Sequence, residues 1–270
     1  MPMDSEASKR DAAPIISLRD ATLCHGRKTV QRHLSFDVRR GSIFAIMGGS
    51  GAGKSTVLRS MIGLLRPYAG TMMVTDKDYW ALEPSGRAAI GRHFGVLFQT
   101  GALWSSLTVG QNVALPLQML TRLDARTIRR LVELKLALVE MDDAIDLFPA
   151  QLSGGMIKRA GLARALALDP NVLFLDEPSS GLDPVSARHF DDLILDLRSA
   201  LGATIVVVSH DLASLFAIAD DGVFLDGQTR TAIAHGSPAE LRDRSQDPRV
   251  HAFMWREESA SPGDRAREVV

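Results

Sequence analysis

The chain has 270 residues, enough to bury one generous hydrophobic core or two modest ones. Hydrophobic residues make up 46% of it and charged residues 23%, which excludes a disordered or collagen-like chain. The 31 basic and 32 acidic residues give a formal net charge of −1, so the overall charge does not indicate a nucleic-acid partner. The single cysteine, Cys24, cannot form an internal disulfide and is expected to be a small packing residue.

Both ends of the chain are polar. Residues 1–14 carry charges of both signs and lack the apolar run of a secretory signal, so we expect a flexible N-terminal tail. Residues 256–270 are expected to form a similar C-terminal tail. The longest apolar runs are far shorter than the roughly 20 residues that span a bilayer. We therefore expect a cytoplasmic protein that does not cross a membrane by itself.

Between these tails, short β-branched runs alternate with helical patterns, which indicates an α/β fold with a largely parallel sheet. The pattern predicts strands over 15–22, 33–38, 42–47, 71–75, 95–99, 172–176, 204–209 and 222–225. It predicts helices over 54–64, 109–119, 125–138, 155–167 and 184–199, and a short one before Gly91. Residues 109–167 contain only helices, so this segment is a helical insertion into the α/β core. We find no internal repeat.

A glycine-rich loop follows the predicted strand over 42–47. Its sequence, Gly48-Gly49-Ser50-Gly51-Ala52-Gly53-Lys54-Ser55, fits the phosphate-loop pattern G-x-x-x-x-G-K-[ST]. Such a loop turns its N–H groups towards phosphate oxygens at the positive end of a helix. The motif predicts that Lys54 reaches the β- and γ-phosphates of a nucleotide and that the Ser55 hydroxyl binds Mg²⁺. A plain glycine turn is the alternative.

Two acidic residues, Asp176 and Glu177, end the apolar run over 172–175. They lie at the carboxyl end of a strand, where open α/β sheets bind their ligands. We expect Asp176 to hold Mg²⁺ through water and Glu177 to accept the proton of the attacking water. An isolated Asp-Glu pair can also be a solvated strand end, but the phosphate loop favours the catalytic interpretation.

The segment Leu152-Ser153-Gly154-Gly155-Met156 precedes a predicted helix, with Ser153 at a capping position. Alone, it could be an ordinary loop before a helix. Combined with the phosphate loop and the acidic pair, it resembles the signature sequence of the ATP-binding-cassette (ABC) ATPases. Three further motifs resemble that family's in the same order: Gln99 its Q-loop, Ser180-Gly181-Leu182-Asp183 its D-loop and His210 its switch histidine.

This resemblance covers roughly residues 15–241 and implies a P-loop NTPase core of ABC ATPase type over 15–255. It implies a small antiparallel β part and an α-helical subdomain over about 100–167. It also implies an Mg²⁺-dependent ATPase with Glu177, His210 and Gln99 in catalysis, and Ser55, Gln99 and Asp176 at the metal. The nucleotide contacts implied are His25, Gly48, Gly49, Ser50, Gly51, Ala52, Gly53, Lys54, Ser55, Thr56, Ser153, Gly154, Gly155 and Asp183.

Two residues depart from the family pattern. Met156 replaces the usual Gln, but the phosphate contacts of that loop are mainly Ser153 and backbone, so we expect activity to survive. His25-Gly26 replaces a Tyr-Gly pair whose aromatic ring stacks on adenine. An imidazole can stack, with a contribution of about 1–3 kcal/mol by analogy with bases on aromatic side chains. Alternatively, His25 is a solvated turn residue.

One phosphate loop and one signature loop per chain predict a head-to-tail homodimer with two ATP molecules between its subunits. Each ATP would lie on Lys54 of one subunit and be closed over by Ser153 of the other.

A narrower resemblance concerns the segments over 97–109, 179–185 and 247–253, which are similar to the Mla-type ATPases of bacterial lipid transport. It implies an MlaE-like permease and an MCE-domain lipid-binding protein as partners, at the cytoplasmic face of the inner membrane. Trp104, where those ATPases tend to have Phe, either belongs to an apolar surface for the permease or packs between the lobes.

Two other functions stay open. One is the ATPase of a transporter for another substrate, and the other is an ABC ATPase of nucleic-acid metabolism. The single cassette and near-neutral charge count against the second.

Overall fold

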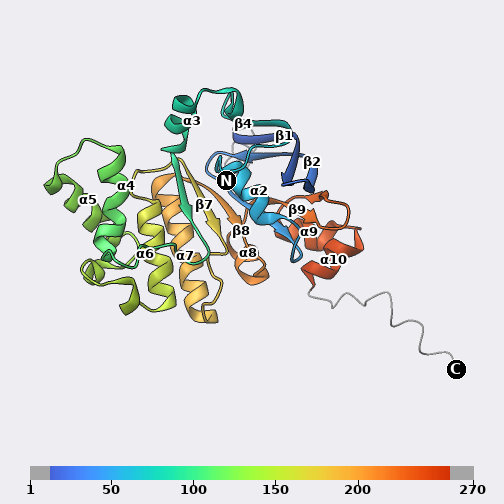
Figure 1. Cartoon of the computed structure of the whole chain (residues 1–270). Helices are drawn as coiled ribbons and strands as arrows, with labels where there is room; N and C mark the ends of the chain where they lie inside the picture. Colours follow the sequence, from blue (N-terminus) through green and yellow to red (C-terminus); the bar gives the residue numbers. More distant parts are fainter. Residues whose placement is uncertain (1–12, 256–270) are drawn as a thin grey trace, which may run out of the picture.

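The computed structural model describes residues 13–255, and a six-stranded sheet runs through its centre (Figure 1). The strand order is β10-β9-β3-β8-β7-β6, with β10 antiparallel to β9 and all other neighbours parallel. The strands are β3 (Ile43–Gly48), β6 (Phe94–Leu97), β7 (Val172–Asp176), β8 (Thr204–Val208), β9 (Asp221–Asp226) and β10 (Thr231–His235). This topology confirms the predicted α/β class.

Side chains of the central strands alternate between two apolar layers. On β3, Ile43, Ala45 and Met47 join one buried cluster, whereas Phe44 and Ile46 join another. Strands buried on both faces have nearly continuous apolar sequences, which is why β3, β7 and β8 could be predicted. The polar atoms at their carboxyl ends therefore emerge from a fixed, fully packed layer.

A second sheet lies beside the first and is antiparallel, in the order β2-β1-β4-β5. Its strands are β1 (Pro14–His25), β2 (Lys28–Arg39), β4 (Ala69–Val74) and β5 (Lys77–Asp78). The rings of Phe36 and Phe44 stack at 5.3 Å between centroids and join the two sheets. The predicted strands over 15–22 and 33–38 were too short, because pairing continues to His25 and Lys28 at the hairpin tip. The tails expected over 1–14 and 256–270 lie outside the described residues, except that β1 already begins at Pro14.

Helices pack on both faces of the six-stranded sheet, and α4 to α6 form the insertion at one side of the molecule, away from the antiparallel sheet (Figure 1). The α-helices are α2 (Lys54–Met61), α3 (Pro84–Gly91), α4 (Val109–Leu120), α5 (Ala125–Ala137), α6 (Gly154–Ala165), α7 (Pro184–Leu201), α8 (Leu212–Ile218), α9 (Pro238–Arg244) and α10 (Pro248–Met254). The 3-10 helices in the described part of the chain are η1 (Tyr79–Ala81), η2 (Asp142–Ala144) and η3 (Pro149–Gln151).

Local sequence sets where these helices begin and end. The helix predicted over 54–64 stops at Met61, because Gly63 has a left-handed backbone with φ +80°. Glycine is required there, since a Cβ would lie 2.2 Å from the Tyr79 hydroxyl. Thr108 begins α4 with a capping box, in which its hydroxyl accepts from the Gln111 N–H and the Gln111 side chain accepts from the Thr108 N–H. Caps and glycines thus place the loops that carry the motifs.

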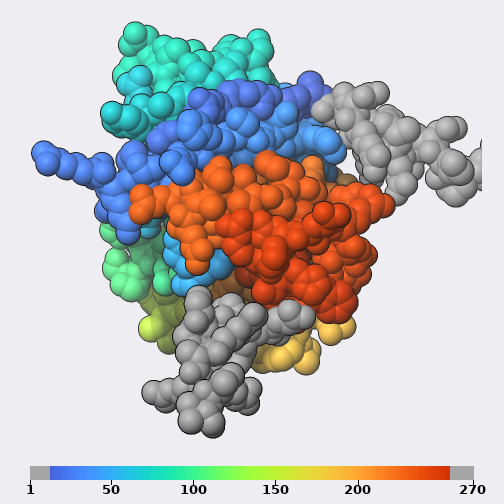
Figure 2. Space-filling model, turned by 90° about the vertical axis from the view of Figure 1, so that its right-hand side faces the viewer, coloured from blue at the N-terminus to red at the C-terminus, as the bar shows by residue number. Residues whose placement is uncertain are grey.

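Short elements near the end of the chain were not predicted. Helices α8, α9 and α10 each have seven residues, and β10 has five. Their caps were visible in the sequence, since Asp211, Ser237 and Asp247 each accept a backbone N–H of the following turn. Figure 2 shows the last part of this segment, with α9 and α10, in red, against the orange β9–β10 segment and below the blue N-terminal strands. Within residues 13–255, no helix combines the length and apolarity needed to cross a bilayer.

Candidate active site

The phosphate loop opens into a cavity of about 910 Å³. Its walls come from the β1–β2 hairpin, the loop between β3 and α2, the segments after β6, β7 and β8, and the C-terminal part of the chain. The lining residues are His25, Lys28, Thr29, Val30, Gly48, Gly49, Ser50, Gly51, Gly53, Lys54, Ser55, Thr56, Gln99, Glu177, His210, Gly227, Arg230 and Phe253. Candidate residues from distant motifs therefore share one cavity, which we call the phosphate-loop cavity.

Two glycines allow this loop to fold against its neighbours. Gly48 has φ +140°, and a Cβ at this position would lie 2.3 Å from the Leu225 carbonyl oxygen. Gly53 has φ +90°, and its Cβ would lie 2.5 Å from a methyl group of Val30. Side chains larger than hydrogen would force the loop away from β9 and the hairpin. The glycines are thus required by close packing as well as by the turn.

Lys54 lies across the loop that precedes it. Its Nζ donates to the carbonyl oxygens of Gly48, at 2.8 Å, and Gly49, at 3.0 Å. Burial lowers the pKa of Lys54, and the carboxylates of Glu177 and Asp176 act in the opposite direction. The two hydrogen bonds hold the Lys54 ammonium beside a loop whose backbone N–H groups can bind an anion.

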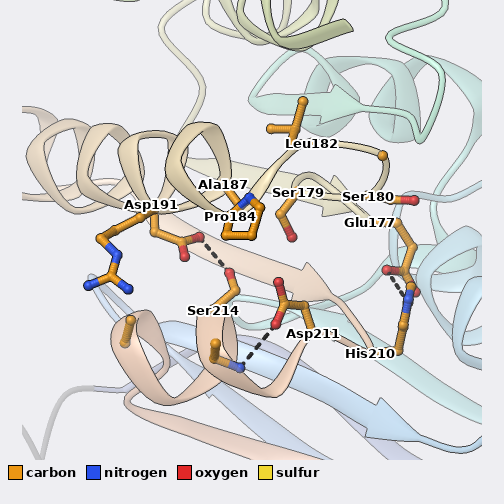
Figure 3. Close-up of a pocket in the computed structure, with 14 residues that line it drawn as sticks. Glu177, Ser179, Ser180, Leu182, Pro184, Ala187, Asp191, His210, Asp211 and Ser214 are labelled. Atoms are coloured by element: carbon orange, nitrogen blue, oxygen red, sulfur yellow. Dashed lines mark hydrogen bonds and ion pairs between the residues drawn. The ribbon is translucent and has the colours of Figure 1, made fainter.

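Glu177 is held from three sides immediately after β7. Its N–H donates to the Val208 carbonyl oxygen at 2.8 Å, and its own carbonyl accepts from Lys158 Nζ at 2.8 Å. Its Oε2 lies 2.7 Å from His210 Nδ1, and Figure 3 shows the two side chains pointing towards each other. The backbone of Glu177 has φ +50°, a left-handed conformation that costs a non-glycine residue roughly 1–3 kcal/mol. These contacts hold the Glu177 carboxylate in one orientation on a strained backbone.

Asp176 lies beside Glu177 and is half-buried. Burial raises the pKa of Asp176, and the nearby Glu177 carboxylate raises it further. Lys158 and Lys54 are among the cations that oppose this rise. A partly desolvated carboxyl group next to a like charge is stabilised in its ionised form by a bound cation.

The residues proposed for Mg²⁺ offer a hydroxyl, an amide and a carboxylate oxygen, the hard donors that this ion prefers. Ser55 and Gln99 line the cavity, and Asp176 ends the adjoining strand. Among the described residues, no cluster of three or more His, Cys, Asp or Glu side chains could cage a metal ion. The set fits an ion that shares its coordination with nucleotide phosphates, the usual arrangement for Mg²⁺ in nucleotide sites.

A smaller cavity, of about 250 Å³, contains the signature residues and is called the signature cavity below. Its lining includes Ser153, Gly154, Gly155 and Asp183, none of which lines the phosphate-loop cavity. Ser153 accepts the Met156 N–H with its hydroxyl at 3.3 Å, which confirms its predicted role as a helix cap. One chain therefore does not bring its signature residues to its own phosphate loop.

Asp183 has a structural role that the motif did not predict. Its Oδ1 accepts the N–H groups of Val185 and Ser186 at 3.0 and 3.1 Å and so caps α7. The side chain of Ala52 is buried and does not line the phosphate-loop cavity, so only its backbone could make the predicted nucleotide contact. The Ala52 carbonyl oxygen accepts from the buried Gln31 amide at 2.7 Å.

A third cavity, of about 610 Å³, shares lining residues with each of the other two, and Figure 3 shows the residues that line it. It shares Glu177 and His210 with the phosphate-loop cavity, and Gly181 and Leu182 with the signature cavity. At its far end, the hydroxyl of Ser214 on α8 donates to the buried Asp191 on α7. Burial raises the pKa of Asp191 to about 6, although the Ser214 hydroxyl opposes this shift. We call this space the connecting cavity.

Some cavity residues were missed by the sequence analysis. Lys28, Thr29 and Arg230 line the phosphate-loop cavity, as does Phe253 from α10. The Phe253 ring packs edge-on against Phe224, with 5.0 Å between centroids. The segment over 247–253 had been noted for a family resemblance, but nothing local in its sequence indicates that α10 folds back to the cavity.

Residues 31–180, more than half of the chain, match the sequence pattern of the ABC transporter family. The chain belongs to this family. The fold is that of ABC cassettes of known structure, and the chain is an ATP-binding and ATP-hydrolysing ABC ATPase.

Among the relatives is the intermembrane phospholipid transport system ATP-binding protein MlaF of Escherichia coli (strain K12), 39% identical over 246 residues. The match covers 91% of this chain and 90% of MlaF. The probable ribonucleotide transport ATP-binding protein mkl of Mycobacterium tuberculosis (strain ATCC 25618 / H37Rv) is 37% identical, over 88% of this chain but 66% of mkl.

Among solved structures, the dimeric post-hydrolysis state of the ATP-binding cassette MJ0796, bound to ADP and Pi, superposes with a TM-score of 0.74. It is 27% identical, and the match covers 82% of this chain and 97% of that one. The chain is therefore an ABC ATPase that resembles MlaF, and a cassette of the same fold forms dimers.

Proposed function

We propose that the chain is the ATPase subunit of a bacterial ABC transporter that moves phospholipid. The observation that carries this proposal is the end-to-end match to MlaF, which leaves only about a tenth of either chain uncovered. The match to mkl covers a smaller share of that protein, whose name specifies another substrate. A transporter for another substrate is therefore the alternative that an experiment must separate.

Hydrolysis in this proposal follows from the groups around the phosphate-loop cavity. The N–H groups of the loop and the Lys54 ammonium bind the β- and γ-phosphates. Glu177 accepts a proton from water as the oxygen attacks the γ-phosphorus, and the bond to ADP breaks on the opposite side. His210, which contacts the Glu177 carboxylate, keeps it aimed at the γ-phosphate end. Mg²⁺, held by Ser55, Gln99 and Asp176, would neutralise charge on the phosphate oxygens.

The base of the nucleotide would lie at the opposite end, near the β1–β2 hairpin. His25 lies at the tip of β1 and lines the cavity, so its imidazole is available to stack on adenine. Phe253 and Arg230 supply further apolar and cationic surface to the same cavity. Stacking on one aromatic side chain contributes about 1–3 kcal/mol in comparable complexes.

A head-to-tail homodimer would complete the site. The separation of the signature cavity from the phosphate-loop cavity within one chain supports it, as does the dimeric MJ0796 cassette. In this arrangement, Ser153 of one subunit closes over the nucleotide on Lys54 of the other. ATP would then bind the closed dimer more tightly than the open one, and this difference in affinity can do work on a permease.

The Q-loop segment offers a surface for an MlaE-like permease at the cytoplasmic face of the inner membrane. Trp104 is 61% exposed, so the alternative in which it packs between the lobes is wrong. The side chain of the buried Asn112 accepts the backbone N–H of Trp104 at 2.8 Å and donates to the backbone carbonyl of Trp104 at 3.1 Å. Together with the exposed Ala102, Trp104 presents an apolar surface whose backbone is fixed by Asn112. Such a surface suits an amphipathic helix of a partner.

A pull-down from detergent-solubilised membranes of the native cell tests this proposal. The tagged chain is expected to recover an MlaE-like permease and an MCE-domain lipid-binding protein. Trp104→Ala should lower their recovery about tenfold, as for a central aromatic interface residue, while ATP binding changes less than twofold. Trp255→Ala is the control, since Trp255 is also exposed but lies directly after α10, as its C-cap.

Recovery of a sugar or metal permease without these partners would overturn the lipid assignment and leave the ATPase unaffected.

A further inference from the structure

A buried lysine of the signature helix reaches the backbone of the proposed catalytic base. Lys158 lies on α6 and is 5% exposed, and its Nζ donates to the Glu177 carbonyl oxygen at 2.8 Å. Lys158 belongs to the helical insertion, whereas Glu177 follows a strand of the core. The contact therefore crosses from one part of the ATPase to the other.

The carbonyl that Lys158 holds belongs to a conformation that the chain does not favour. Glu177 has φ +50° and precedes Pro178, whose ring further restricts the residue before it. The same carbonyl also accepts the Ser180 N–H, but at 3.2 Å. Lys158 thus makes the shorter of the two contacts that resist rotation of this peptide unit.

The lysine is retained there at an energetic cost. Burial lowers the pKa of Lys158, whereas the Glu177 and Asp176 carboxylates raise it. The other buried lysine of the helical insertion, Lys135, instead pairs directly with the carboxylate of Asp169. A buried ammonium that contacts a neutral carbonyl gains less from its partner than one paired with a carboxylate.

We propose that Lys158 is a positioning residue that holds the Glu177 backbone so that its carboxylate faces the attacking water. This inference rests on the proposed role of Glu177 as the base. Because α6 begins at the signature loop, Lys158 also ties the orientation of Glu177 to the position of the helix that carries Ser153. A displacement of α6 would then change the alignment of the base within the same subunit.

The test compares steady-state ATPase kinetics of the full-length chain with Lys158→Met, Lys158→Arg and the control Lys135→Met. Methionine fills the lysine site without a donor, so kcat should fall about tenfold while KM and the affinity for ATP change less than twofold. A misplacement of about 1 Å in a catalytic group can cost as much as 10²-fold. Lys158→Arg, which restores a cationic donor, should recover kcat to within about threefold, and Lys135→Met should match the parent.

The inference is overturned if Lys158→Met keeps the parental kcat, or if kcat, ATP affinity and melting temperature fall together in both Lys158 variants. If Lys158→Met does not fold, Lys158→Gln, whose shorter amide cannot reach as far, replaces it with the same expected loss of kcat. A parent chain without ATPase activity would instead contradict the proposed function.

Discussion

The phosphate-loop cavity and the signature cavity differ in how they are built. The first lies at the carboxyl ends of β3, β7 and β8, and its key side chains are held by contacts from several segments. The second is smaller and is formed by the first turn of α6 and the D-loop turn before α7. One chain thus carries two cavities with different lining residues, as the proposed head-to-tail dimer requires.

Different attachments to the core account for this division. Parallel strands fix the ends of β7 and β8 relative to each other through the sheet. The signature loop instead depends on α6, which packs apolar residues against the sheet and makes polar contacts to Glu177 through Lys158 and to the Q-loop segment through Arg164. The Arg164 guanidinium donates to the carbonyl oxygens of Gly101, at 2.9 Å, and Ala102, at 2.6 Å. Polar contacts thus add to an apolar cluster that joins the helical insertion to one face of the sheet.

The largest expected effect is on the phosphate-loop side of the comparison. Glu177→Gln should lower kcat by 10²–10⁴-fold, the usual contribution of general base catalysis, because an amide cannot accept the proton of the attacking water. ATP binding should persist, and the ATP-bound dimer should accumulate because turnover is blocked. Phosphate release and equilibrium nucleotide binding measure the two effects separately.

Glu140→Gln is the matched control for this substitution. Glu140 also contacts a histidine, His189, with 2.6 Å between Oε2 and Nε2, but neither side chain lines the phosphate-loop cavity. Its kcat should stay within twofold of the parent. A Glu177→Gln variant that hydrolyses ATP at the parental rate would show that another group is the base.

The second prediction tests whether the two cavities act on each other across a dimer. Ser153→Arg should block closure by its bulk, and Lys54→Ala should remove the main phosphate cation. When the two substitutions are placed on different subunits of a mixed dimer, one site keeps both Lys54 and the Ser153 that faces it. When both are placed on the same subunit, each site loses one of them.

We expect ATPase activity about tenfold higher in the first mixed dimer than in the second, measured after tandem purification with two tags. The opposite order would mean that Ser153 acts on the Lys54 of its own chain. Full activity of a purified monomer, independent of protein concentration, would contradict the dimer altogether.

The sequence predicted the phosphate-loop side of this comparison more completely than the packing around it. The phosphate-loop pattern indicated Lys54, the acidic strand end indicated Glu177 and the family resemblance indicated His210, and the structure brings all three to one cavity. Each follows a buried strand whose end lies at the same edge of the sheet. Motif spacing could not show that Ala52 faces the core or that Asp183 caps α7, since loop dihedral angles decide which way such side chains point. Those orientations depend on contacts that spacing alone does not encode.

Long-range packing was also beyond the sequence. Phe253 reaches the phosphate-loop cavity only because α10 returns to β9, and Lys158 reaches Glu177 only because α6 packs beside β7. Neither Phe253 nor Lys158 belongs to a motif that predicts which residue its side chain contacts.

The smallest expected effect concerns stability and the connecting cavity between the two compared sites. The pKa of Asp191 is raised to about 6, mainly by burial, from an ordinary value of 3.8. Between these two values the native state holds a proton that the unfolded state has lost, so stability falls as pH rises through this window and stays lower above about pH 6. Asp191→Asn removes this titration, while its amide oxygen can still accept from Ser214.

The full shift corresponds to at most about 3 kcal/mol, at 1.36 kcal/mol per pKa unit. Urea unfolding should therefore show that the stability of Asp191→Asn relative to the parent increases by about 1 kcal/mol from pH 5 to pH 8. The exposed neighbour, Asp192→Asn, should show no such increase. ATPase activity should stay within twofold at both pH values, because Asp191 lies at the end of the connecting cavity opposite Glu177 (Figure 3). An equal stability difference at both pH values would refute the raised pKa, whereas a large loss of activity would assign this carboxylate to catalysis and join the connecting cavity to the phosphate-loop site.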